Sequence, residues 1–227
     1  MSKLYRLASR IGEVPRDAVD RVGGEPIGMT KEMWPLCDGE PMKHVITLGR
    51  NLIVHALPKH VAAVAVFINS IDDNEAYAPD TDKTRVVFLA REDLARGTTS
   101  AEDLFGAPLE GDLGAAGTVV MAVSEYDYDE IKDLEAETAE DDGSPEDISY
   151  AVGPYMQEQL DTEIDGLRVN GLSAEHAWWL QYPEGPEDHR VLFWFYDELV
   201  PGLNCGGGAM YVTADEGCRE GLAWWQP

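Results

Sequence analysis

The chain has 227 residues, 44% of them hydrophobic and six of them tryptophan, so apolar burial can drive folding without disulfides or metals. Its 43 acidic and 17 basic side chains give a net charge of −26, which argues against binding to nucleic-acid phosphate or anionic lipid. The first residues lack the apolar run that a secretory signal requires, and no apolar run reaches the ~20 residues that a membrane span needs. Three scattered cysteines fit a reducing compartment, so we expect a soluble cytoplasmic protein.

The acidic residues are concentrated in one part of the chain. Residues 1–60 have a net charge of +2, whereas residues 125–165 contain sixteen acidic side chains and one basic side chain, Lys132. This stretch therefore dominates the electric field of the molecule.

The first residues predict two short helices. Leu4, Leu7 and Ile11 have the spacing of one face of an amphipathic helix. Pro15 suits the first turn of a second helix, which the glycine pair at residues 23–24 would end.

A block of strands follows these helices, with Gly, Pro and polar residues between the strands. The predicted strands are residues 43–48, 51–57, 61–68 and 85–90. Four strands within so few residues predict antiparallel pairing, because a parallel crossover needs a dozen or more residues. A short helix at residues 100–104 and a strand at residues 118–124 come next.

The acidic stretch contains a further predicted helix. Ser144 suits its N-cap and Pro145 its first position, and the helix is expected to run to about Asp165. After it, aromatic-rich strands are predicted at residues 177–182, 190–196, 209–214 and 221–226. The fold class that follows is α+β, mainly antiparallel sheet with a few peripheral helices.

Short motifs near both ends of the chain share their order and spacing with one bacterial family. They are GG-x-P at residues 23–26, W-P-x-C at 34–37, a P-M-led strand from residue 41, W-L-Q at 179–181, GGG-A-M-Y at 206–211 and W-W-Q at 224–226. This pattern resembles the YwqG-like family of bacterial domains of unknown function. Two departures are Asp38-Gly39-Glu40, where relatives often have a second Cys, and Thr47, where they often have Gln.

The resemblance implies a single domain over residues 1–227. It also implies two related halves, about 20–125 and 166–227, joined by the acidic helical segment. The family has no agreed enzymatic activity, and some relatives appear beside secreted toxin genes. The resemblance therefore points to an immunity role more than to catalysis.

No catalytic, metal-binding or cofactor-binding set emerges from the residues. The five histidines, His44, His55, His60, His176 and His189, lack the spacing of tetrahedral zinc sites. The glycine run at 206–208 lacks the Lys-Ser/Thr of a phosphate-binding loop and predicts a tight turn. Residues 80–84 start like a calcium loop but lack its Gly and its bidentate Glu.

Two tryptophan pairs allow two interpretations. Adjacent residues on a strand point to opposite faces, so one ring of each pair leaves the main core. Either another element covers the outer rings, or Trp178, Trp179, Trp224 and Trp225 line an aromatic cleft for a ligand or protein.

The acidic stretch likewise allows two interpretations, a solvated face or a protein-binding surface. Tyrosines alternate with carboxylates at its start, which combines aromatic anchors with charge. The candidate partner-binding residues are Glu125, Tyr126, Asp127, Tyr128, Asp129, Glu130, Asp133, Glu140, Asp141 and Asp142.

The first hypothesis is a non-enzymatic acidic binding protein, most specifically an immunity protein that occludes a basic toxin domain. The alternative is an enzyme or small-molecule-binding protein that uses the aromatic cleft. A third hypothesis, a nucleic-acid mimic directed at a host protein, shares the acidic surface and differs in its partner.

Overall fold

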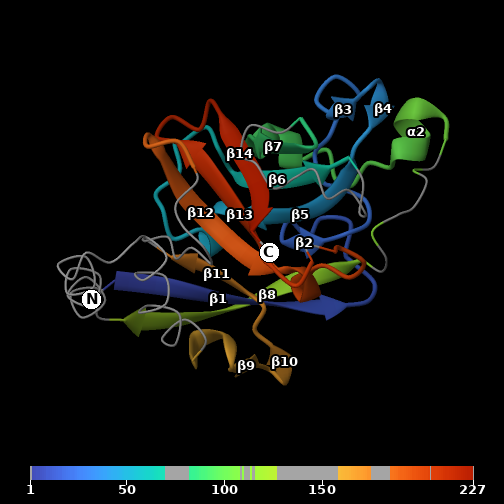
Figure 1. The fold of residues 1–227 in the computed structure, drawn as a ribbon. Coiled ribbons are helices and arrows are strands. Elements are labelled where there is room, and N and C mark those ends of the chain that lie inside the picture. The colour runs from blue at the N-terminus through green and yellow to red at the C-terminus, as the bar shows by residue number, and fades with distance from the viewer. Residues whose placement is uncertain are drawn as a thin grey trace.

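Ten strands form one antiparallel sheet in the computed structural model, which describes residues 2–69, 82–107, 109, 113, 116–126, 158–174, 185–204 and 206–226 (Figure 1). The strand order is β14-β13-β12-β11-β1-β8-β2-β5-β6-β7. Their bounds are β1 (Ser2–Ile11), β2 (Arg21–Val22), β5 (Lys43–Gly49), β6 (Ala63–Ile68), β7 (Thr84–Leu89), β8 (Gly117–Tyr126), β11 (Gly171–Ala174), β12 (His189–Tyr196), β13 (Ala209–Asp215) and β14 (Gly221–Gln226). The predicted mainly antiparallel sheet with short helices is confirmed.

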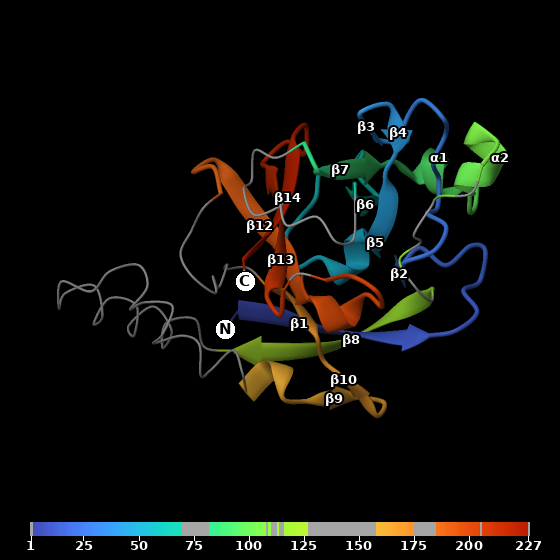
Figure 2. The same ribbon diagram turned by 45° about the vertical axis from the view of Figure 1, so that its right-hand side comes forward.

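The two ends of this strand order lie side by side, so the sheet is a nearly closed barrel (Figures 1 and 2). The Thr84 hydroxyl on β7 donates a hydrogen bond to the carbonyl of Ala223 on β14. Gly221 leaves room for β7, because a Cβ added there would lie 2.7 Å from Val86 Cγ1 and 2.8 Å from Phe88 Cζ.

The barrel interior is a packed apolar core rather than a lumen. Two 3-10 helices, η1 (Arg50–Leu52) after β5 and η2 (Asp197–Leu199) after β12, help to fill it. Leu52 and Leu57 near η1 and Leu199 and Leu203 near η2 all belong to the interior cluster. β5 and β12 run in opposite directions, because five antiparallel steps separate them in the sheet, so the two helices lie toward opposite ends of the barrel.

The outer surface of the barrel is also apolar and covered, on each of its two halves. On one half, Phe67 and Leu89 pack against Trp34 and Ala101. Trp34 precedes the hairpin of β3 (Leu36–Cys37) and β4 (Glu40–Pro41), and Ala101 begins α2 (Ala101–Phe105), which follows α1 (Arg91–Leu94). On the opposite half, Ile164 of the hairpin formed by β9 (Glu163–Ile164) and β10 (Leu167–Arg168) joins the outer cluster of β1 and β11 to β14. Strands that are buried on both faces do not alternate polar with apolar residues, which explains the apolar sequences of these strands.

Several predicted elements are confirmed. Predicted strands 43–48, 61–68, 85–90, 118–124, 190–196, 209–214 and 221–226 correspond to β5, β6, β7, β8, β12, β13 and β14. The predicted helix at 100–104 is α2, whose N-cap Ser100 accepts a hydrogen bond from the Asp103 N–H and whose C-cap Gly106 has φ +81°.

The two predicted N-terminal helices are wrong. Residues 2–11 form β1, where Leu4 packs in the outer cluster and Leu7 in the interior, so helical spacing arose from a strand buried on both faces. Residues 13–20 contain no helix, because the buried Arg21 guanidinium donates to the carbonyls of Ala18 and Glu25 and holds this segment as a loop.

Two further predictions need correction. The predicted strand at 51–57 is η1 followed by irregular chain whose apolar side chains fill the barrel. The helix expected to reach Asp165 stops earlier, because residues 158–160 are helical and β9 begins at Glu163. Residues 145–157 of that helix, and the strand expected at 177–182, lie outside the described residues.

A search of the described helices for a membrane span, by length and apolar character, finds none.

Candidate functional site

The end of β8 carries the first two residues of the predicted partner-binding set. Glu125 pairs with Lys3 and Tyr126 with Ser2 in the β1–β8 ladder. The other members lie outside the described residues: Asp127, Tyr128, Asp129, Glu130, Asp133, Glu140, Asp141 and Asp142. The structure therefore fixes where the acidic stretch begins, at the end of a long strand pair.

The strand beside β8 is basic. Lys3, Arg6 and Arg10 all come from β1, which contains no acidic residue. Arg10 makes a 3.8 Å ion pair with Asp165 between two exposed side chains, a kind of pair that contributes little to stability. The acidic stretch thus begins next to the most basic strand of the sheet.

An aromatic row crosses the outer face of β12, β13 and β14. The rings of Trp194 and Tyr211 are stacked with centroids 6.0 Å apart, and those of Tyr211 and Trp224 with centroids 6.3 Å apart. Cross-strand register continues the row to Leu172 on β11 and Arg6 on β1. Direct cross-strand pairing therefore places these side chains next to one another on one face of the sheet.

The two C-terminal tryptophans lie on opposite faces of β14, as predicted. Trp225 belongs to the barrel interior and Trp224 to the outer cluster. Their exposures are 1% and 0%, so they do not line one open cleft as the aromatic hypothesis required. Trp178 and Trp179 lie outside the described residues.

Two N–H groups on this outer face have no acceptor among the described residues. They are Nε1 of Trp194 and Nε of Arg6, and both atoms are buried. Buried donors without an acceptor are uncommon in folded proteins and cost about 1–3 kcal/mol each.

His44 is a structural histidine. It is 2% exposed, with Nδ1 3.0 Å from the Gly23 carbonyl and Nε2 2.8 Å from the Thr47 hydroxyl. The carbonyl can only accept, so Nδ1 carries the proton and the neutral ring accepts from Thr47. Burial lowers the pKa of His44 to about 4, so the ring is neutral at pH 7.

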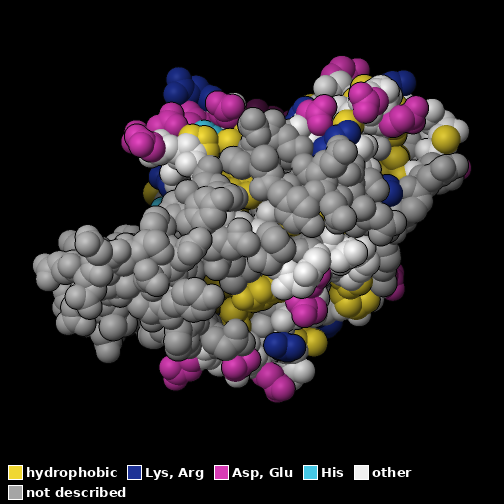
Figure 3. All heavy atoms as spheres, viewed as in Figure 1, with side chains coloured by type: hydrophobic (Ala, Val, Ile, Leu, Met, Phe, Trp, Pro, Cys, Tyr) yellow, Lys and Arg dark blue, Asp and Glu magenta, His cyan; other side chains and the backbone are white. Residues whose placement is uncertain are grey.

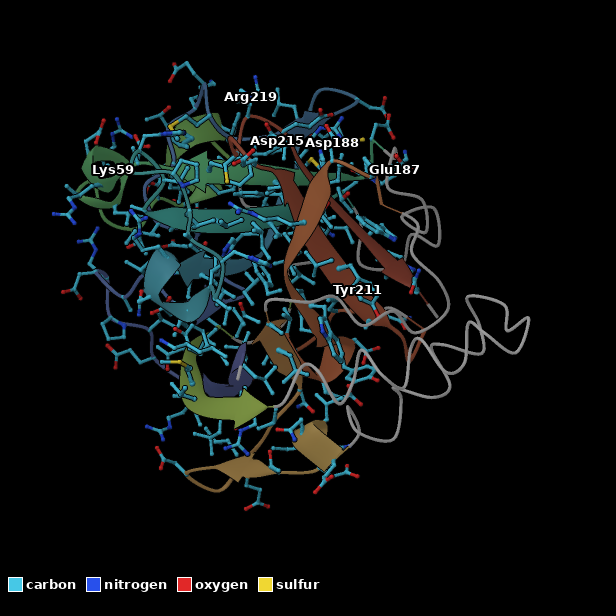
Figure 4. All side chains as sticks on the ribbon, turned by 90° about the vertical axis from the view of Figure 1, so that its left-hand side faces the viewer. Lys59, Glu187, Asp188, Tyr211, Asp215 and Arg219 are labelled. Atoms are coloured by element: carbon cyan, nitrogen blue, oxygen red, sulfur yellow. The ribbon has the colours of Figure 1, made fainter. Side chains whose placement is uncertain are left out.

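Asp215 organises the turn between β13 and β14. Its carboxylate accepts from the backbone N–H groups of Glu220 (2.9 Å) and Arg219 (2.6 Å) and from Arg219 Nε (3.0 Å). These bonds, with that of Glu220 the strongest influence, lower its pKa to about 2. Figure 4 shows Asp215 and Arg219 together at the end of β13, away from Tyr211 on the same strand.

The thiols and the glycine run also have structural roles. Cys37 and Cys218 are buried, and burial raises the pKa of both thiols, which leaves them protonated and unreactive. Gly206 and Gly207 have φ values of +66° and +82° in a turn that leads into β13, as predicted. Among the described residues no group of three His, Cys, Asp or Glu side chains is placed to hold a metal.

Trp194 and Tyr211 are not among the site residues predicted from the sequence. A signal for Trp194 was present, because Trp194 and Tyr196 alternate with Phe193 and Phe195 in the predicted strand at 190–196, whereas Tyr211 lies in the separate predicted strand at 209–214. Such alternation of aromatics predicts a strand with rings on both faces.

No protein-family model matches the chain, and no curated protein matches its sequence.

Proposed function

We propose that this protein is a non-enzymatic acidic binding protein that neutralises a cognate basic toxin domain by occluding it. The observation that carries the proposal is the acidic and tyrosine-containing sequence 125–142, which starts where β8 ends beside β1. Complementary charge accelerates association, and tyrosines supply desolvated anchors. The partner is a protein with exposed Lys and Arg.

The distribution of charge supports this role. The described residues hold 24 acidic and 16 basic side chains, so 19 of the 43 acidic side chains and one basic side chain fall in the rest of the chain. On the face shown in Figure 3, the described acidic side chains lie at separate places rather than in one patch. The strongest concentration of negative charge is therefore the one that the sequence places after β8.

The packed barrel also supports binding rather than catalysis. Side chains from η1 and η2 help to fill the interior, and His44 has both ring nitrogens in hydrogen bonds. Proteins that bind by surface complementarity need no interior pocket.

Affinity capture from the producing cells tests the proposal. The tagged protein should retain a basic partner at low salt and less of it at high salt, because screening weakens long-range attraction. A variant with Asp127→Asn, Asp129→Asn and Glu130→Gln should capture less. A matched control, Glu13→Gln, Glu92→Gln and Glu102→Gln, removes the same charge from exposed sites elsewhere and should capture normally. Equal capture by both variants would refute the assigned surface.

A small-molecule-binding role is the second candidate. The buried Trp194 N–H without a described acceptor favours it, because a ligand oxygen would satisfy that donor. Trp194→Phe keeps an aromatic side chain and removes the indole N–H, so any ligand that raises the melting temperature of the original protein should lose this effect in the variant.

We further propose that the chain is a single YwqG-like domain of two related halves. In support, β5 and β12 each contain a register shift and each leads into a 3-10 helix that packs into the barrel. Each is followed by two strands in antiparallel order, β6 and β7 or β13 and β14. β1 lies between β11 and β8, so the first strand joins the two halves in the sheet.

A further inference from the structure

One edge of β8 has no strand paired with it along most of its length, within the part of the chain that the structure describes. β8 pairs with β1 over its full length, from Tyr126 opposite Ser2 to Gly117 opposite Ile11. On its other side, β2 pairs only with Gly117 and Thr118. Figures 1 and 2 show β1 and β8 as a long pair that continues well past β2.

Two hydrogen bonds fix the direction of the backbone groups in β8. The N–H of Val119 donates to the Asp20 carbonyl on the β2 side, at 3.1 Å. The carbonyl of Ala116 accepts from the Gly12 N–H on the β1 side, at 3.0 Å. Successive residues of an antiparallel strand direct their N–H and C=O groups alternately to the two sides, so odd-numbered residues of β8 point away from β1.

The N–H and C=O groups of Met121, Val123 and Glu125 therefore point to the open edge. Folded proteins protect such edges with Pro, Lys or a bulge. β8 has the sequence GTVVMAVSEY and an unbroken register with β1, so it carries none of these devices. Val123 is 55% exposed, which adds an apolar contact at the same place.

We propose that this edge of β8 binds an extended cationic polypeptide segment as an added strand. The inference rests on the proposed function and adds the mode of binding, in which backbone hydrogen bonds hold the segment and charge selects it. Cationic residues are favoured because Glu125 lies on the edge and the sequence to residue 165 has sixteen acidic side chains and one basic side chain. A second copy of this chain is a poorer occupant, because two chains of charge −26 repel each other.

Variants at one position separate backbone pairing from charge. The probe is a blocked peptide of about ten residues in which Lys alternates with Val and Thr. Val123→Pro removes an N–H that points to the open edge and leaves the even-numbered residues free to bond β1, so the fold should tolerate it. Val123→Ala keeps that N–H and is the matched control. We expect V123A to bind within about threefold of the original and V123P to bind at least about tenfold more weakly, the effect of losing ~1.4 kcal/mol.

Variants of the peptide test the same idea without altering the protein. N-methylation of alternate residues removes the donors on one side of the peptide strand. We expect one of the two alternate sets to abolish binding and the other to leave it within about threefold, because only one side faces β8. Equal binding of both methylated peptides, together with full binding by V123P, would overturn the inference.

Two controls distinguish failure of this inference from failure of the proposed function. A fully N-methylated cationic peptide cannot pair as a strand. If this peptide still binds in a salt-sensitive way, the result would support the acidic surface and reject strand addition at the β8 edge. Hydrogen exchange should show the amides of Met121, Val123 and Glu125 unprotected in the free protein and protected with the peptide. Protection of these amides in the free protein would also reject the inference. Protection that is independent of protein concentration would indicate an intramolecular occupant, and protection that rises with concentration would indicate a second copy.

Discussion

His44 makes the stability of this fold sensitive to mildly acidic pH. The folded protein keeps the ring neutral down to about pH 4, whereas a histidine in the unfolded chain takes up its proton near its ordinary pKa of 6.5. The unfolded state therefore binds more protons between these values, and the free energy of unfolding falls as pH falls. A difference of about 2.5 in pKa corresponds to about 3 kcal/mol when the transition is complete, and about 2 kcal/mol is lost by pH 5.

Denaturant unfolding at several pH values between 7.5 and 5 measures this effect while most carboxylates stay ionised. His44→Gln removes the titrating group, so its unfolding free energy should fall by about 2 kcal/mol less than that of the original protein over this range. The ring signals of His44 in an NMR titration check the pKa directly. Parallel pH profiles for the two proteins, or a His44 pKa near 6.5 in the folded state, would refute the argument.

Three further predictions concern the barrel, the N-terminal loop and the acidic surface. Gly221→Ala should destabilise the fold by about 1–3 kcal/mol, because the new Cβ meets Val86 and Phe88 of β7, and Val86→Ala should recover part of that loss in a thermal melt of the double variant. Arg21→Met should lower the free energy of unfolding by about 2–4 kcal/mol and speed amide exchange in residues 13–25, because the carbonyls of Ala18 and Glu25 lose their donor. Unchanged amide exchange in residues 13–25 would show that the loop keeps its structure without the Arg21 hydrogen bonds. Tyr126→Ala should speed dissociation of the captured partner, at a cost of about 2 kcal/mol if the ring is a desolvated anchor, whereas an unchanged dissociation rate would place the anchor elsewhere.

The sheet was predictable because strand signals are local. The runs that became β5, β6 and β7 are rich in branched residues and are bounded by turn residues, and their short spacing required antiparallel order. Helix α2 was equally predictable, since its capping residues Ser100 and Gly106 act on backbone groups only a few residues away.

The errors arose where tertiary burial decides local structure. β1 is buried on both faces, so Leu4 and Leu7 gave a helical spacing without a helix. The chain after β5 looks like a strand because its apolar residues fill the barrel, and the pairing needed to tell the two apart is long-range. Burial of Trp224 by packing on an outer sheet face was also beyond local reasoning, because the sequence shows which rings leave the core but not what covers them.

The proposed function requires that negative charge after β8 steers a basic partner onto this protein. Its most direct test is the association rate of the captured partner, measured for the original protein and for the Asp127→Asn, Asp129→Asn, Glu130→Gln variant as salt is raised past physiological strength, where the Debye length is ~8 Å. We predict that the original protein associates faster at low salt, that its rate falls steeply with salt, and that the variant shows a smaller rate and a shallower fall, while the dissociation rates stay similar. Equal association rates and equal salt slopes for the two proteins would contradict the account.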